Sequence, residues 1–145
     1  MLCYRKMTLI LIKSTSNQNL KKALTLSYHF GLRAAECAKL KFEDIKSNGI
    51  SIIDSKGKRS RFILAETEKQ KQILEQIKER EQGRIFHIQH QSLEQAFRRE
   101  IKKNNIPIQN GAFHTCRKAY ATQNIKSIVR TVYLLKRLCQ RFLLI

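Results

Sequence analysis

The amino-acid sequence predicts an α+β domain that is mainly helical and has one small antiparallel sheet. Apolar residues recur every three or four positions through most of the 145 residues, which is typical of amphipathic helices. The segment GISIIDSKGKRSRFIL, residues 49–64, instead has two β-branched or aromatic runs around a Lys-Gly-Lys turn, which predicts a hairpin. Because no internal repeat or Pro/Gly-rich linker divides the chain, we expect one compact domain.

The N-terminal third is expected to hold two helices. Residues 1–16 show no clear periodicity and lead into a polar KSTSN cluster, which predicts a linker or an N-terminal extension. A helix is predicted to follow and to close at Gly31, because apolar residues keep helical spacing at Leu20, Ala23 and Leu24. A second helix is predicted from about Arg33 to Leu40.

Two more helices are predicted on the C-terminal side of the hairpin. Thr67-x-x-Gln70 has the pattern of a capping box, in which each of the two side chains bonds a backbone amide of the other residue. This pattern predicts a helix that starts after Thr67 and stops near Gly83. Ser92-x-x-Gln95 is predicted to start the next helix in the same way.

The C-terminal segment is predicted to be helical on both sides of residue 125. After a loop marked by Pro107, the segment AFHTCRKAYATQN, residues 112–124, resumes helical periodicity. We expect residues 126–145 to form a separate basic, amphipathic helix. Its apolar stripe comprises Ile128, Val132, Leu135, Cys139 and Phe142.

The charge of the chain predicts a polyanionic partner. Lysine and arginine number 29 against 11 acidic residues, a formal net charge of +18. After Glu100 no acidic residue follows, whereas basic residues continue to Arg141. Such an imbalance destabilises a fold through self-repulsion and is typical of proteins that bind nucleic acid. Double-stranded DNA is the leading candidate.

Several other classes of function have no support in the sequence. The cysteines, Cys3, Cys37, Cys116 and Cys139, lie far apart and form no C-x-x-C pair, so neither a zinc site nor redox chemistry is indicated. Cys37 and Cys139 occupy apolar helical positions and are interpreted as core residues. No segment approaches the length of a membrane span or of a signal peptide, so we expect a cytoplasmic protein without a membrane partner. Phosphate-loop, dinucleotide, zinc-protease and nucleophile-elbow motifs are missing, and no metal or cofactor is expected.

Four basic side chains form a candidate catalytic set. Arg33 follows a Gly-Leu helix break, and Lys56 lies in the hairpin turn. His114 and Arg117 are one helical turn apart and therefore share a face. Two guanidiniums can hold the oxygens of a transferring phosphoryl group, while an imidazole and an ammonium move protons. We expect the four side chains to converge around one phosphate-sized site.

Three segments resemble the signatures of the tyrosine recombinases, the family of phage integrases and Xer-type resolvases. GLRAAECAKLKFEDI, residues 31–45, is similar to the first signature, and FHTCRKAYAT, residues 113–122, to the second. IDSKGKRSRFIL, residues 53–64, is similar to the hairpin that carries a lysine just before a glycine. The matches occur in family order, and the resemblance implies a DNA-gripping catalytic domain at residues 17–125, flanked by 1–16 and 126–145.

The resemblance also implies a mechanism that uses neither metal nor nucleotide. A tyrosine attacks the scissile phosphate and forms a 3′-phosphotyrosyl link that conserves the bond energy for rejoining. Arg33 and Arg117 would hold the non-bridging oxygens, Lys56 would protonate the departing 5′ oxygen, and His114 would assist proton transfer. Glu36 would orient Arg33 or pack near it. The residues expected to contact DNA around this site are Lys58, Arg59, Arg61 and Lys118.

Two departures from the family pattern concern the second half of the catalytic set. Lys118 stands where the family usually has a second histidine. The sequence LCQR, residues 138–141, stands where a Leu-Gly-His is due, and the nucleophilic tyrosine is unknown. Tyr120 falls at a position of an aromatic core residue, and Tyr133 lies on the apolar and basic stripe. We therefore expect the chain, which lacks both ends of the family pattern, to be inactive alone.

Other interpretations stay open at this level. Arg33 could be a helix-start arginine paired with Glu36, Lys56 could lie in a merely solvated basic turn, and His114 could only cap a helix. For the whole chain, one alternative is a recombinase catalytic domain, which could assemble as a homo-oligomer on DNA. The other is a non-catalytic remnant or regulator that occupies recombination sites. A basic RNA-binding protein is a third alternative, which leaves the three signatures unexplained.

Overall fold

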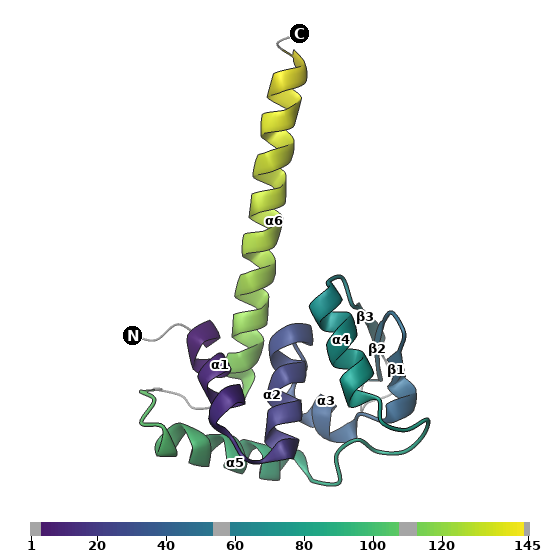
Figure 1. Ribbon diagram of the computed structural model, residues 1–145, viewed down its shortest axis with the longest axis vertical. Coiled ribbons are helices and arrows are strands. Elements are labelled where there is room, and N and C mark those ends of the chain that lie inside the picture. The colour runs from purple at the N-terminus through teal and green to yellow at the C-terminus, as the bar shows by residue number, and fades with distance from the viewer. Residues whose placement is uncertain (1–3, 54–58, 108–112, 144–145) are drawn as a thin grey trace.

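The computed structural model describes residues 4–53, 59–107 and 113–143 and confirms the mainly helical α+β fold that the sequence predicts (Figure 1). The helices and strands follow one another in this order: α1 (Tyr4–Ser14), α2 (Gln18–Phe30), α3 (Ala34–Lys39), the 3₁₀ turn η1 (Phe42–Asp44), β1 (Ile45–Lys46), β2 (Gly49–Ile53), β3 (Ser60–Leu64), α4 (Glu68–Ile77), α5 (His90–Lys103) and α6 (His114–Leu143). One contiguous hydrophobic core joins these elements, with Phe30, Phe86, Phe97 and Phe113 fully buried in it.

The N-terminal segment is a helix rather than a linker. Met7 and Leu11 of α1 are buried in the common core, and Thr8 between them is fully buried as well. Only this narrow face is covered, while Arg5, Lys6 and Lys13 are exposed. Apolar residues at 7 and 11 are too few to stand out among the Leu-Ile repeats of this segment, so its periodicity is hard to read from the sequence.

Helix α2 has both of the end signals that its sequence predicts. The Asn17 side chain accepts a hydrogen bond from the Leu20 amide at 3.2 Å, which satisfies one of the free N–H groups of the first turn. At the other end Gly31 adopts a left-handed conformation with φ of 71°, and its amide donates to the Ser27 carbonyl. The chain then turns directly into α3.

The predicted hairpin is confirmed, and a third strand extends it. Strands β1, β2 and β3 form an antiparallel sheet in that order, with Ile50 opposite Ile63 and Ile52 opposite Arg61. Ile50 and Ile52 are buried against the core. The two-residue strand β1 is too short to give an alternating pattern, which is why the sequence did not reveal it.

Helices α4 and α5 follow the predicted pattern with two differences, the first being that α4 ends at Ile77 rather than near Gly83. The Thr67 capping box is confirmed: Gln70 donates its amide to the Thr67 hydroxyl at 3.2 Å and accepts the Thr67 amide at 3.1 Å. Helix α5 begins at His90, before the predicted start at Ser92, because Gln89 already serves as its N-terminal flanking residue. Its buried residues are Leu93 and Phe97.

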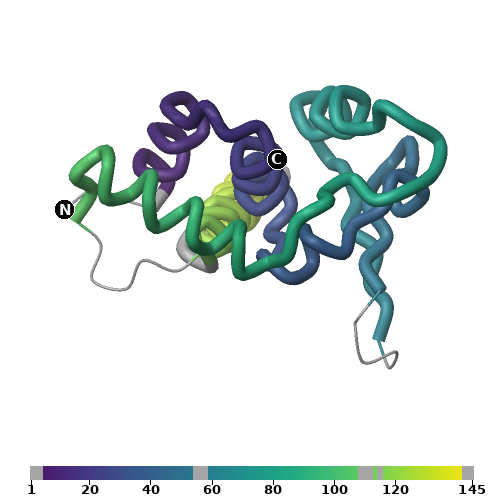
Figure 2. The backbone as a smooth tube through the Cα atoms, turned by 90° about the horizontal axis from the view of Figure 1, so that it is seen from below, coloured from purple at the N-terminus to yellow at the C-terminus, as the bar shows by residue number. Residues whose placement is uncertain are grey.

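Helix α6 is one continuous helix of 30 residues, not two. Between Phe113 and Leu143 no glycine or proline interrupts it. Its first turns, with Cys116 and Ala119 buried, contact α1 and α2. Figure 2 shows the same arrangement from below, with α6 seen end-on beside α2. Helix α5, at the bottom of Figure 1, crosses on the viewer's side.

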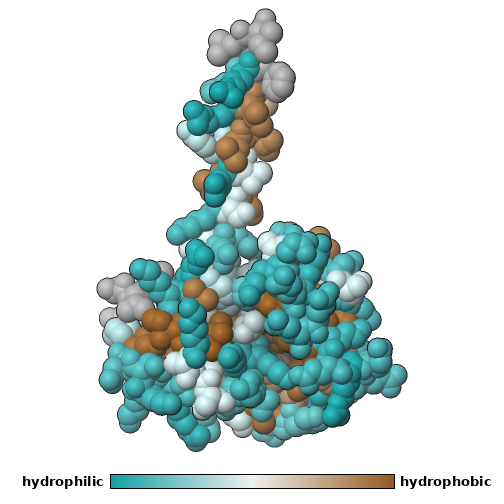
Figure 3. Space-filling model, in the orientation of Figure 1, coloured by the Kyte–Doolittle hydropathy of each residue, from teal (hydrophilic) through white to brown (hydrophobic). Residues whose placement is uncertain are grey.

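Beyond Ala121 helix α6 projects from the body of the domain, and its side chains are exposed through Arg141 (Figures 1 and 3). Ile125 is 62% exposed, and the apolar stripe that continues from it is visible along the projecting helix in Figure 3. Cys139, interpreted from its spacing as a core residue, is exposed; Cys37 is buried as predicted. Within the described ranges, no helix is both long enough and apolar enough to cross a membrane.

Candidate functional site

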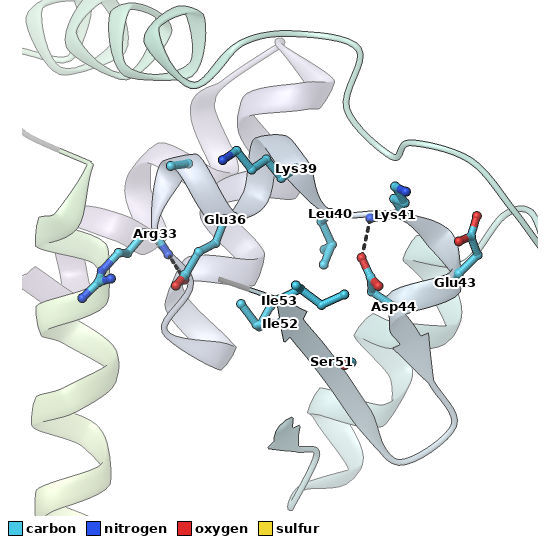
Figure 4. Close-up of a pocket in the computed structure, with 11 residues that line it drawn as sticks. Arg33, Glu36, Lys39, Leu40, Lys41, Glu43, Asp44, Ser51, Ile52 and Ile53 are labelled. Carbon is cyan, nitrogen blue, oxygen red and sulfur yellow. Dashed lines mark hydrogen bonds between the residues drawn. The ribbon is translucent and has the colours of Figure 1, made fainter. Parts of the chain in front are cut away.

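The candidate site lies where the start of α3, strand β3 and the first turns of α6 meet. Arg33 occupies the residue immediately before α3 and is exposed. Its backbone amide donates to the carboxylate oxygen Oε2 of Glu36 at 2.9 Å. Its guanidinium extends away from that carboxylate, toward α6 (Figure 4). Among the described ion pairs, the carboxylate of Glu36 pairs with Arg61 and not with the guanidinium of Arg33.

Glu36 is held by a residue of the sheet. Arg61 of β3 donates from both terminal nitrogens, Nη1 to Oε1 and Nη2 to Oε2, each at 2.8 Å. The two planar groups therefore form a bidentate pair, which fixes orientation as well as distance. The side chain of Glu36 is only 15% exposed and that of Arg61 is 42% exposed. One carboxylate thus joins β3 to the backbone of Arg33.

Arg117 brings a third guanidinium to the same place. Burial lowers the pKa of Arg117, and the positive charges of Arg33 and Arg61 lower it further, while the carboxylate of Glu36 raises it. These effects place Arg117 within electrostatic reach of all three residues, although it comes from the second signature and they come from the first signature and the hairpin. Of the four predicted catalytic residues, Arg33 thus lies within electrostatic reach of Arg117.

The close approach of α6 depends on Gly31. A Cβ atom at this position would lie 2.4 Å from Cδ1 of Tyr120, closer than real Cβ atoms approach other atoms. The ring of Tyr120, one turn after Arg117, occupies the space that a side chain would need. Gly31 is thus required both for the left-handed turn before Arg33 and for the close contact with Tyr120, one turn after Arg117.

Two hollows flank this cluster. One has a volume of about 250 Å³ and is lined by Arg61, Arg117, Tyr120 and the apolar residues around Gly31. The other has a volume of about 420 Å³ and runs from Arg33 and Glu36 along α3 to Ser51 of β2 (Figure 4). Its far end is lined by both lysines and carboxylates, so the hollow with Arg61 and Arg117 is the more uniformly cationic of the two.

The other predicted site residues are placed only in part. Lys56 and Lys58 lie outside the described residues, so the structure neither joins them to the arginines nor separates them from them. His114 is the first residue of α6, and its side chain is outside the description. Arg59, the residue before β3, is exposed, and so is Lys118 of α6.

The pairing of Arg61 with Glu36 is the feature that sequence reasoning missed. The sequence predicts Arg61 as one of the residues that contact DNA around the site. The two partners are 25 residues apart, and nothing in either segment marks the other. Only the register of β2 with β3, which aligns Arg61 with Ile52, points the side chain toward α3.

In the described part of the chain, no group of three or more His, Cys, Asp or Glu is placed to hold a metal ion.

The tyrosines differ in their surroundings. Tyr28 is buried, and its hydroxyl accepts a hydrogen bond from Nε of Arg5 at 3.1 Å. Tyr120 is partly buried against Gly31. Tyr133 is 61% exposed on the projecting half of α6, where the guanidinium of Arg137 lies 5.9 Å from its ring centroid. Of these three rings, only that of Tyr120 lines a hollow with Arg117.

Comparison with known proteins identifies relatives of this arrangement. The sequence model of the phage integrase family matches residues 4–135, which includes α1 and most of α6. No curated protein sequence matches the chain. The match therefore covers all of the elements that form the arginine cluster.

Solved structures share the fold at low sequence identity. The catalytic domain of bacteriophage HP1 integrase is 18% identical with a TM-score of 0.63, and the similar region covers 83% of this chain and 67% of that one. A lambda integrase dimer bound to a COC′ core site is 19% identical with a TM-score of 0.70, and the shares covered are 88% of this chain and 50% of that one. XerA recombinase is 18% identical with a TM-score of 0.67, with 84% and 49% covered. The chain thus spans about half the length of the lambda and XerA chains.

Proposed function

This chain belongs to the phage integrase family, and we propose that it is the DNA-binding catalytic domain of a site-specific tyrosine recombinase. The observation that carries the proposal is that the first signature, the hairpin and the second signature meet at one place, where Arg61 and Arg117 line one hollow and the charge of Arg33 reaches Arg117. Adjacent guanidiniums repel, and the arrangement becomes favourable when an anion with several oxygens lies between them. A DNA phosphate is such an anion.

In the proposed reaction the arginine pair stabilises the transition state. Charge on the non-bridging oxygens of the scissile phosphate grows as the nucleophile attacks, and guanidiniums aimed at those oxygens stabilise that charge. Lys56 would protonate the departing 5′ oxygen, and His114 would assist proton transfer at the attacking side. These two roles follow from the match to the family signatures. DNA contacts would continue onto Lys58, Arg59 and Lys118.

Double-stranded DNA is the proposed partner, in the cytoplasm, and we propose that the protein self-associates on its DNA site. The net charge of +18 supports a polyanionic partner. The lambda integrase structure to which this chain is similar is a dimer bound to a core site. We extend both properties, DNA binding and self-association on DNA, to this chain as parts of the proposal.

A second candidate is a non-catalytic DNA-binding remnant or regulator. It is favoured by the tyrosines: Tyr28 is buried and bonded, Tyr120 packs on Gly31, and Tyr133 lies out on the projecting half of α6. Without a nucleophile in line with the leaving oxygen, the arginines can bind a phosphate but cannot break a strand. We therefore expect the 145-residue chain alone to bind DNA without covalent capture.

One experiment tests the binding and the chemistry together. Fluorescence anisotropy with duplex DNA should show affinity falling by roughly 10³-fold or more between 50 and 200 mM salt, as expected for six or more phosphate contacts. Arg33→Ala and Arg117→Ala should each lower the slope of log affinity against log salt by about one. Arg80→Ala, which removes an exposed charge after α4, is the matched control and should leave the slope unchanged.

The same DNA, nicked so that a covalent intermediate is trapped, then separates the two candidates. The expected result is no covalent protein–DNA band. A band that disappears in Tyr133→Phe or Tyr120→Phe would establish catalysis by this chain and exclude the non-catalytic remnant. Affinity that is independent of salt would contradict the DNA-binding proposal itself.

A further inference from the structure

The bidentate pair between Arg61 and Glu36 sets these two residues apart from the other described ion pairs. Lys22–Glu79 and Lys71–Glu68 each join one nitrogen to one oxygen, and their carboxylates are 57% and 84% exposed. Pairs of that kind contribute little because water screens them. Glu36, at 15% exposure, is shielded, and both of its oxygens are engaged by the fork of Arg61.

The geometry links Arg61 to Arg33 through a single intermediate. Oε2 of Glu36 accepts one hydrogen bond from Nη2 of Arg61 at 2.8 Å and another from the Arg33 backbone amide at 2.9 Å. Fixing the carboxylate therefore fixes the backbone at the start of α3. The side chain of Arg33 departs from that point toward α6 (Figure 4).

The charge balance supports the same connection. Arg33 and Arg61 are both close enough to Arg117 to lower its pKa, and Glu36 is the carboxylate that raises it. If the fork were lost, Glu36 would be free to pair with the Arg33 or Arg117 guanidinium, because guanidiniums and carboxylates attract at short range. That new pair would occupy a guanidinium which the proposed function assigns to the phosphate.

We propose that Arg61 is a positioning residue: its fork holds Glu36, which fixes the backbone of Arg33 and leaves the guanidiniums of Arg33 and Arg117 available for a DNA phosphate. This inference rests on the proposed function and changes one assignment within it, because Arg61 then acts through Glu36 rather than by contacting DNA. Binding of phosphate by the pair Arg33 and Arg117 would depend on a side chain that does not touch the phosphate.

The variants Arg61→Lys and Glu36→Gln separate positioning from direct contact. Lysine keeps the charge but has no planar fork. If Arg61 contacted a phosphate directly, lysine would replace it with little loss, since an ammonium also binds phosphate. If Arg61 positions Glu36, Arg61→Lys should weaken binding to duplex DNA by about tenfold, the scale of one lost charge-assisted hydrogen bond.

The double variant closes the cycle. Once Glu36→Gln has removed the carboxylate, adding Arg61→Lys should produce no further loss of affinity, because the two residues act in series. Independent losses that multiply in the double variant would overturn the proposal. So would Arg61→Lys with the affinity of the unaltered chain.

Amide hydrogen exchange tests the same link without DNA. The Arg33 amide should exchange faster in Arg61→Lys, because its acceptor is no longer fixed, while the Gly31 amide, which donates to Ser27, should be unaffected. Acceleration of both amides would indicate general loosening and would overturn a specific link, as would no change at Arg33. If the unaltered chain failed to bind DNA, the proposed function would fail, whereas this measurement would still decide whether Arg61 positions Arg33.

Discussion

Replacing Gly31 by alanine should destabilise the domain through two separable effects. The first is backbone strain, because a φ of 71° is left-handed and places alanine at a disadvantage of about 1 kcal/mol. The second is a clash, because the new Cβ would lie 2.4 Å from Cδ1 and 2.7 Å from Cε1 of Tyr120. Overpacking of this kind costs about 1–3 kcal/mol. The sum is a loss of about 2–4 kcal/mol.

Thermal or urea unfolding measures this loss directly. For a domain of this size each kcal/mol lowers the midpoint by roughly 2–4 °C, so Gly31→Ala should melt roughly 5–15 °C below the unaltered chain. Tyr120 lies one turn after Arg117, so displacing its ring should also move Arg117 away from Arg33. Affinity for duplex DNA should therefore fall in conditions where Gly31→Ala is still fully folded.

A double-mutant cycle with Tyr120→Ala separates the clash from the strain. In the Tyr120→Ala background, Gly31→Ala should lose only the strain of about 1 kcal/mol, because the ring is no longer there to clash. Gly31→Asn is a second control: asparagine tolerates the left-handed region but still carries a Cβ, so the clash should remain. Equal losses for Gly31→Ala in both backgrounds would refute the account of why this position is glycine.

Two further predictions concern the cysteines and α6. Burial raises the pKa of Cys116 from an ordinary value of 9.0 to about 12 and also raises the pKa of Cys37. As the pH rises above 9, the unfolded chain therefore loses these protons before the folded chain does, and the free energy of unfolding should fall. Urea unfolding at pH 7 to 11 should show this fall, and Cys37→Ala with Cys116→Ala should flatten it; a constant free energy of unfolding in the unaltered chain would contradict the burial. In α6, backbone amides from Ile125 onward should exchange hydrogen much faster than those from Cys116 to Tyr120, because an exposed helix gains no stability from packing. Equal protection along the whole helix would contradict this prediction.

The parts of the fold that the sequence predicted are those whose signals are local. Gly31 closes α2, Thr67 caps α4, and the alternating residues on either side of the hairpin turn pair as β2 and β3. In each case the residues that decide the conformation are within a few positions of one another, so their chemistry can be read without knowing the fold. The convergence of Arg33, Lys56, His114 and Arg117 around one site stays a prediction, to which the structure adds that Arg33 lies within electrostatic reach of Arg117.

The remainder depended on contacts between distant segments. The apolar spacing of α6 is the same before and after Ala121, yet Cys116 is covered by other helices while Cys139 is exposed. Periodicity reports that a helix has an apolar face, but not whether another element covers that face. Helix α1 shows the opposite case, since two covered residues, Met7 and Leu11, suffice to join it to the core.

The position of Glu36 among three guanidiniums helps to explain how these positive charges can lie close together when no anionic ligand is bound. Three positive charges and one negative charge leave a net charge of two (3 − 1), and burial already lowers the pKa of Arg117. Without the carboxylate the cluster would hold three like charges around a partly buried position, which is costly in a medium less polar than water. Because the negative charge of Glu36 offsets the positive charge of Arg61, the two remaining positive charges are those of Arg33 and Arg117. A phosphodiester has one negative charge in the ground state and gains charge on its non-bridging oxygens as a nucleophile attacks, so two uncommitted guanidiniums stabilise the transition state more than the ground state. On the proposed function, a carboxylate free to pair with either arginine would weaken that preference, so the fork of Arg61 would affect catalysis without contacting the phosphate.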